Sequence, residues 1–151
     1  MSAFRLPSSR SVLSARWSVD DEKVERLKQI VEKTKAEIVL ISTWKKYWRK
    51  EEKLKPLQDY SANYLDEKLA KQGLKVIDKT KDKADGRYLS RGESILEYVC
   101  HNNVEKYIIL DDCQFDYDGC YLTDCLIKTK QAEGLTKAQA ENACEILLKQ
   151  L

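Results

Sequence analysis

Apolar and polar positions repeat along the chain with two different periods. Residues 18–34 carry apolar side chains at helical spacing, which predicts a helix that buries one face. The next stretch, EIVLIS at 37–42, is a continuous apolar and β-branched run without polar alternation. Such a run is typical of a strand covered on both faces, as in a parallel sheet. A helix followed by a buried strand is therefore the first predicted unit.

Helix and strand patterns continue to alternate up to the last residues. Further helices are predicted at 58–72, at 90–102 and from Thr136 onward, and further strands at 74–78, 106–112 and 125–129. Two helix starts carry capping boxes, Ser90 with Glu93 and Thr136 with Gln139. The polar stretch 79–88 is predicted to be a loop. This alternation predicts an α/β fold with a mainly parallel sheet.

The length and uniformity of the chain indicate one domain. Its 151 residues are about the length of a single domain, and they contain no internal repeat, low-complexity tract or linker. We expect one domain at 18–151, preceded by an irregular N-terminal segment at 1–17. Because this segment is rich in Arg and Ser, an organelle transit segment is the alternative that it leaves open.

Charge and apolar content restrict the partners of the domain. The chain has 27 basic and 25 acidic side chains, a net charge of +2, so any nucleic-acid partner must be bound by a local patch. The longest apolar stretches are about six residues, far short of the ~20 that span a bilayer, so we expect no membrane partner. The oligomeric state is not predicted.

The five cysteines indicate a reducing compartment. Their number is odd and no Cys-x-x-Cys pair is present, which argues for free thiols and a cytoplasmic protein. A zinc site built from Cys113, Cys120, Cys125 and the single histidine, His101, is the alternative. Structural zinc sites normally bring their ligands in close pairs, which these residues do not form.

Two adjacent carboxylates end the apolar run at 106–112. Asp111 and Asp112 repel each other unless a cation or a basic group lies beside them. In parallel α/β sheets, ligands bind beyond the carboxyl ends of the strands. We therefore expect these two acids to share one edge of the molecule with Ser42 and Thr43, which follow the strand at 37–42. Ordinary solvated turn residues are the alternative.

These motifs carry a resemblance to a known family. IVLIST and the later YIILDD resemble motifs II and IV of the haloacid dehalogenase (HAD) superfamily. More narrowly, EIVLISTWKK, the KT at 79–80, SRGESILEYV, YIILDD and GLTKAQAENACEIL are similar to the small HAD domain found in multidomain RNA repair proteins. The similarity runs from about residue 18 to the C-terminal residue. It implies a Rossmann-like three-layer fold and Mg²⁺-dependent hydrolysis of phosphate esters.

The resemblance also implies roles for individual residues. Ser42 takes the role of bonding the phosphoryl oxygens, and Arg91 that of offsetting their charge, as a guanidinium does through paired hydrogen bonds. Asp111 and Asp112 take the magnesium role, for which hard carboxylate oxygens are suited. The implied substrate is a phosphorylated small molecule or a nucleic-acid end.

Further contacts to that substrate are expected from the segment after the first strand. Thr43, Lys45 and Lys46 directly follow the motif II position, so they border the same edge of the sheet. We predict that these three residues bind the substrate.

The chain departs from the family pattern at motif I. A HAD phosphohydrolase needs an apolar strand ending in Asp-x-Asp, but the first aspartate of this chain is Asp20. FDYDG at 115–119 has similar letters but follows the preceding strand too closely, and it does not fit a calcium loop. We therefore assign no nucleophile, and without one no aspartyl-phosphate intermediate forms. Magnesium binding is expected to be weak or absent.

The missing motif also affects the expected sheet. In the HAD fold the motif I strand is central, so we expect a central strand that is missing or replaced. RSVLSARWSV at 10–19 is a possible replacement through Val12, Leu13 and Trp17, but it is basic and poorly apolar for a central position. We favour a chain that starts downstream of motif I, with 1–17 as a loop. A natural inactive form is the alternative.

A basic and aromatic segment at 44–50 predicts a second kind of function. WKKYWRK interleaves rings with cations, the combination that binds single-stranded nucleic acid. A non-catalytic module that binds RNA or a phosphorylated partner is thus the alternative to a phosphatase domain. The structural interpretation of the same residues is that Trp44 and Trp48, four positions apart, pack on the core.

Overall fold

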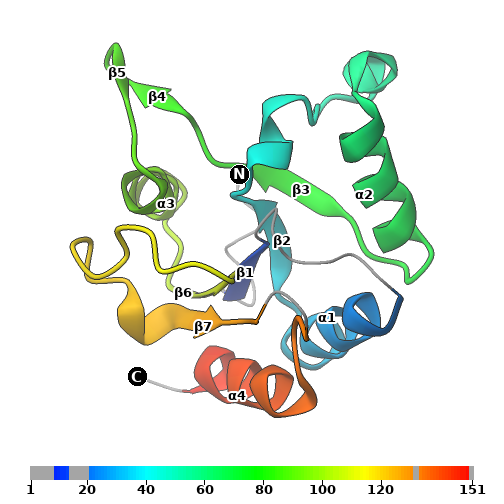
Figure 1. The fold of residues 1–151 in the computed structure, drawn as a ribbon, viewed down its shortest axis with the longest axis vertical. Helices are drawn as coiled ribbons and strands as arrows, with labels where there is room; N and C mark the ends of the chain where they lie inside the picture. The colour runs from blue at the N-terminus through cyan, green and yellow to red at the C-terminus, as the bar shows by residue number, and fades with distance from the viewer. Residues whose placement is uncertain (1–8, 14–20, 131–132, 150–151) are drawn as a thin grey trace.

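A five-stranded parallel sheet forms the centre of the protein (Figure 1). The computed structural model describes residues 9–13, 21–130 and 133–149; the side chains of 9–13, 21, 43 and 44 lie outside the description. The strands follow the order β3-β2-β1-β6-β7. They are β1 (Ser9–Leu13), β2 (Glu37–Leu40), β3 (Val76–Lys79), β6 (Lys106–Asp111) and β7 (Leu126–Lys128).

Strand β1 occupies the central position of the sheet. Val12 pairs with Val39 of β2 on one side and with Ile109 of β6 on the other. Of the two expected outcomes, a central strand that is missing or one that is replaced, the structure has the replacement, through Val12 and Leu13 of the stretch considered for it. The N-terminal segment that was expected to be irregular contains this strand. A strand bonded along both edges gains backbone hydrogen bonds whatever its side chains, so a five-residue strand suffices without a long apolar run. Trp17, the third residue of the possible replacement strand, lies outside the described residues.

Within the described ranges, four α-helices cover the sheet, as the sequence predicts. They are α1 (Asp21–Thr34), α2 (Tyr60–Ala70), α3 (Arg91–His101) and α4 (Lys137–Leu148). Both predicted capping boxes are formed, Ser90 with Glu93 at α3 and Thr136 with Gln139 at α4. Residues 18–20, at the predicted start of the first helix, are not described. The helical periodicity and the caps thus place all four helices.

Alternate residues of the strands pack into two apolar clusters. Leu40 and Leu110 belong to the cluster that includes residues of α1, α2 and α4. Val39 and Ile109 belong to the cluster that includes residues of α3. Figure 1 shows α3 on one side of the sheet and α1 and α4 together on the other. An α/β fold with a parallel sheet is confirmed; the finer Rossmann-like three-layer class stays a prediction.

A small hairpin occupies part of 79–88, where the polar sequence predicts only a loop. Strands β4 (Lys83–Ala84) and β5 (Arg87–Tyr88) pair antiparallel and project beside α3 (Figure 1). Asp85 and Gly86 join them with φ of 54° and 76°. An Asp-Gly pair with positive φ is typical of a two-residue hairpin turn. The polar composition of the stretch predicts a loop and does not by itself indicate this turn.

Three short 3-10 helices are also described. η2 (Thr43–Lys46) and η3 (Glu52–Leu57) lie between β2 and α2, and η4 (Thr123–Cys125) precedes β7. Among the described helices, none combines the length and the apolar composition needed to cross a membrane.

Candidate phosphate site

The carboxyl ends of β2, β3 and β6 meet at one edge of the parallel sheet, where a cavity lies. Ser42 follows β2 by two residues, and Asp111 is the last residue of β6. The cavity has a volume of about 210 Å³. Its lining comprises Ile41, Ser42, Lys45, Lys46, Asp82, Leu89, Ser90, Arg91 and Ser94. Three cations against one carboxylate make this lining net positive, so it suits an anion.

Lys45 is the most enclosed cation of this cavity. Its side chain is buried, and Nζ donates to Oγ1 of Thr80 at 2.8 Å and lies 3.1 Å from Oδ1 of Asp82. Burial lowers the pKa of Lys45; Asp82 opposes that effect and the charge of Arg91 adds to it. An anion in the cavity would favour the charged form of this lysine.

Lys79 and Thr80, at the end of β3, hold the segment that carries Lys45. Nζ of Lys79 donates to the carbonyl oxygens of Lys45 at 2.7 Å and of Trp48 at 2.8 Å. Burial, followed by the charge of Arg49, lowers the pKa of Lys79. The Lys-Thr pair thus fixes Lys45 through its backbone and through its ammonium group.

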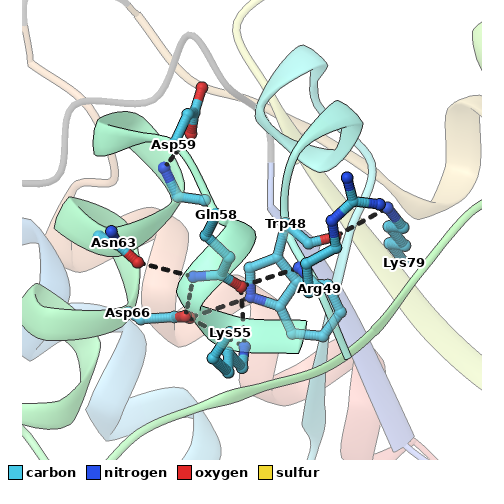
Figure 2. Close-up of polar contacts among 9 residues, drawn as sticks. Trp48, Arg49, Lys55, Gln58, Asp59, Asn63, Asp66 and Lys79 are labelled. Atoms are coloured by element: carbon cyan, nitrogen blue, oxygen red, sulfur yellow. Dashed lines mark hydrogen bonds and ion pairs between the residues drawn. The ribbon is translucent and has the colours of Figure 1, made fainter. Parts of the chain in front are cut away.

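A polar network on the other side of this segment completes its attachment (Figure 2). Gln58 accepts from the backbone N–H of Arg49 at 2.8 Å and donates to Asp66 at 3.0 Å. Trp48 is buried and donates from Nε1 to Asp66 at 3.0 Å. Nζ of Lys55 lies 4.3 Å from the centroid of the Trp48 ring. The structural interpretation of Trp48 is therefore confirmed, and this ring is not available to stack on a ligand.

Arg91 connects the cavity with the acids at the end of β6. It is the first residue of α3, directly after the cap Ser90. Nη1 lies 3.3 Å from Oδ2 of Asp111, and Cζ lies 4.2 Å above the ring of Phe115. A cation at a helix N-terminus is electrostatically unfavourable. The buried carboxylate of Asp111 offsets that cost.

Asp111 is fully buried and accepts hydrogen bonds at both carboxylate oxygens. Oδ2 accepts from the hydroxyl of Tyr117 at 2.6 Å, and Oδ1 accepts from the backbone N–H of Cys113 at 3.1 Å. Burial, and then the hydrogen bond to Asp111, strongly raise the pKa of Tyr117. The charge of Asp111 is thus balanced by protein groups, with Arg91 as the counter-ion.

The acids fit a magnesium site only in part. Carboxylate oxygens of Asp111 and Asp112 and the Cys113 thiol lie within 4.8 Å of one another. Oδ1 of Asp112 is buried and has no hydrogen-bond partner, as a metal ligand would be. However, Asp111 is already bonded to three donors, and a thiol is a poor ligand for a hard cation. This set therefore offers two carboxylates, of which Asp111 is already paired with Arg91.

The zinc alternative is not supported within the described part of the chain. Asp111, Asp112 and Cys113 form a group of potential metal ligands there, whereas Cys113, Cys120, Cys125 and His101 do not gather. The five cysteines form no disulfide bonds with one another. Thr43, predicted to bind substrate, begins η2, but its side chain is not among those described.

Asp116, in the segment that resembles motif I, has a structural role. It accepts a hydrogen bond from the Ser90 hydroxyl and another, at 2.8 Å, from the backbone N–H of Gly92. These bonds hold the start of α3, and hence Arg91, against the loop after β6. Rejection of this segment as a nucleophile motif is consistent with that geometry.

The residues that follow the central strand can be read from the sequence. Strand β1 ends at Leu13, and the following residues are Ser14, Ala15 and Arg16. In the HAD arrangement the nucleophilic aspartate follows the central strand. No carboxylate occurs in these three residues, whose structure lies outside the described ranges. The sequence therefore offers no aspartate directly after the central strand.

Three residues of the site were not identified as such from the sequence. The KT at 79–80 is part of the family resemblance, but its bonds to Lys45 depend on how β3 pairs with β2. Tyr117 lies in the segment rejected as motif I, and its contact with Asp111 depends on the loop after β6. Local sequence signals do not report either contact.

A comparison with known families identifies the chain as a HAD-like hydrolase domain. A family model, described as the HAD domain in Swiss Army Knife RNA repair proteins, matches residues 4–140. The chain belongs to this family. HAD domains generally use Mg²⁺. No curated protein and no solved structure matches the chain.

Proposed function

We propose that this chain binds the phosphorylated end of a nucleic-acid strand without hydrolysing it. The observation that carries this proposal is the cavity lined by Ser42, Lys45, Lys46 and Arg91, at the edge of the sheet where β2 and β6 end. In the sequence, Ser14 is the residue after the central strand. In a Rossmann-like three-layer scaffold, this edge is where ligands bind.

Phosphate binding and phosphate hydrolysis depend on different chemical groups. Binding a phosphate monoester requires hydrogen-bond donors and positive charge, which a serine, lysines and an arginine supply. Hydrolysis through a covalent intermediate requires a nucleophile. Since Ser14, Ala15 and Arg16 offer no carboxylate, we infer that phosphate is held but not transferred.

A second cavity adjoins the first and favours a strand over a free phosphate. Its volume is about 810 Å³, and Lys46 and Asp82 line both cavities. The lining comprises Lys46, Lys50, Asp78, Lys79, Thr80, Lys81, Asp82, Lys83 and Tyr88. Five lysines face two aspartates, which suits a ligand with several phosphates.

An aromatic ring accompanies these lysines. Tyr88 is 71% exposed, and Nζ of Lys83 lies 4.3 Å from its ring centroid. Rings among cations bind the bases and backbone of single strands. We therefore place the proposed strand along the lysine-lined cavity. This location replaces the stacking segment at 44–50, since Trp48 is buried.

The test compares short labelled RNA and DNA strands with 5′-phosphate, 3′-phosphate or hydroxyl ends by fluorescence anisotropy. We expect one phosphorylated end to bind at least about tenfold tighter than hydroxyl ends, as one charge-assisted hydrogen bond is worth that factor. Malachite-green assays with Mg²⁺ should detect no phosphate release. Equal affinity for phosphorylated and hydroxyl ends overturns the binding proposal, and sustained phosphate release overturns the non-hydrolytic one.

A triple variant and its matched control locate the strand. Lys81→Ala, Lys83→Ala and Tyr88→Ala together should weaken strand binding and reduce its salt dependence, because phosphate contacts release counterions. The control combines Lys53→Ala, Lys71→Ala and Tyr60→Ala, which removes the same groups from exposed positions outside both cavities. Equal effects of the two triple variants contradict the proposed strand path.

A further inference from the structure

We propose that Arg91 supplies the fixed positive charge that a divalent cation supplies in metal-dependent HAD domains, so that phosphate binding here is independent of metal. This inference rests on the proposed phosphate site and names Arg91 as the residue whose positive charge binds the phosphate. Arg91 lines the cavity and also contacts Asp111, one of the two acids that the family resemblance assigns to magnesium.

The position of Arg91 is held from three sides. Its side chain is 14% exposed, its guanidinium pairs with a carboxylate that is fully buried, and its Cζ lies 4.2 Å from the centroid of the Phe115 ring. Asp116 fixes the first turn of α3 from the loop after β6. A guanidinium held in this way is preorganised to bind an anion, since little conformational freedom remains to be lost.

Arg91 and a dication would compete for Asp111. A carboxylate has about four acceptor positions, and those of Asp111 already serve the hydroxyl of Tyr117, the guanidinium of Arg91 and the N–H of Cys113. A divalent cation bound there would lie beside a guanidinium of like charge. The repulsion between them disfavours both being present.

The other ligands do not compensate for this competition. Asp112 offers one buried oxygen without a partner, but the third group nearby is the soft thiol of Cys113. The three residues after the central strand in the sequence, Ser14, Ala15 and Arg16, include no carboxylate. Asp112 therefore remains as the main hard ligand, whereas Arg91 already neutralises Asp111.

The test is titration of the full chain with inorganic phosphate by calorimetry, in EDTA and in Mg²⁺. We expect wild-type affinities that agree within about twofold. Arg91→Gln should weaken binding in EDTA by about 10- to 100-fold, the worth of one charge-assisted hydrogen bond. Because this change also removes the competitor for Asp111, Mg²⁺ should restore part of the lost affinity.

Arg87→Gln is the matched control, since Arg87 is 65% exposed and pairs with Glu93 outside the cavity. It removes one nearby positive charge and should change the affinity by no more than about twofold. If Arg91→Gln fails to fold because Asp111 loses its counter-ion, Arg91→Gln with Asp111→Asn replaces it. This pair should bind phosphate weakly both with and without Mg²⁺.

The results of this experiment distinguish failure of the role of Arg91 from failure of the proposed phosphate site. Wild-type binding that is tightened at least about tenfold by Mg²⁺, or that is unaffected by Arg91→Gln, overturns the role of Arg91 and leaves the phosphate site standing. Absence of phosphate binding in both EDTA and Mg²⁺ overturns the proposed phosphate site, and the role of Arg91 with it.

Discussion

The hydroxyl of Tyr117 donates a 2.6 Å hydrogen bond to Oδ2 of Asp111, and neither side chain is accessible to solvent. Tyr117→Phe should lower the free energy of unfolding by about 1–3 kcal/mol, because a buried carboxylate oxygen loses a donor. Urea denaturation monitored by circular dichroism measures this change. Tyr121→Phe is the control, as Tyr121 is 94% exposed. Equal stability of the two variants contradicts the prediction.

The same pair makes stability depend on alkaline pH. Burial and the bond to Asp111 raise the pKa of Tyr117 above its ordinary value of 10.0. The folded protein therefore holds this proton more tightly than the unfolded chain does, and stability decreases as pH rises above about 10. Below that pH both states are protonated and the contribution is complete. Urea midpoints between pH 8 and 11 should fall less steeply in Tyr117→Phe than in the wild type.

Gly92 is required where α3 meets the loop after β6. A Cβ added there would lie 2.7 Å from Sγ of Cys120 and 3.1 Å from Oδ1 of Asp116. Gly92→Ala should therefore cost about 1–3 kcal/mol of unfolding free energy through overpacking. Gly119→Ala is the matched control, because its Cβ would lie 3.6 Å from the nearest atom. Thermal denaturation compares them, and a Gly92→Ala variant as stable as the control contradicts the tight contact.

Gln58 holds the segment between β2 and α2 in place. It bonds to Arg49, Asn63 and Asp66 and is 8% exposed. Gln58→Ala should cost about 1–3 kcal/mol, since buried polar groups lose their partners. Gln29→Ala on the exposed face of α1 should cost much less. Because the segment also carries Lys45, weaker phosphate binding should accompany the loss of stability. If Gln58→Ala matches Gln29→Ala in both stability and phosphate binding, the proposed role of Gln58 is contradicted.

Lys45 makes phosphate binding depend on pH. Its pKa lies below 10.5, chiefly because of burial, so it loses its charge at lower pH than an exposed lysine. We expect phosphate affinity to decrease as pH rises through that lowered value. Lys45→Arg, which keeps its charge, should shift the decrease to higher pH. Calorimetric titrations with phosphate at several pH values between 7 and 10 measure both curves. Superimposable pH profiles of the two proteins exclude Lys45 as the titrating group.

Parts of the candidate site were predictable from the sequence because simple rules connect them to the fold. Ser42 and Asp111 follow apolar strand runs, and the carboxyl ends of parallel strands share one edge. The family resemblance added Arg91. Lys79 and Tyr117 were not predictable as site residues, because each acts through a contact with a segment that is distant along the chain or turned back by a loop.

By itself, the sequence determined the four helices, the two capping boxes, the buried strands after the first helix and the absence of an aspartate at motif I. These features depend on periodicity and on residues within one or two turns of each other. Only the tertiary structure decided that Ser9–Leu13 is the central strand and that Arg91 is the counter-ion of Asp111. Both are pairings across long separations in sequence. Their stability comes from hydrogen bonds and charges that meet only after the sheet has formed.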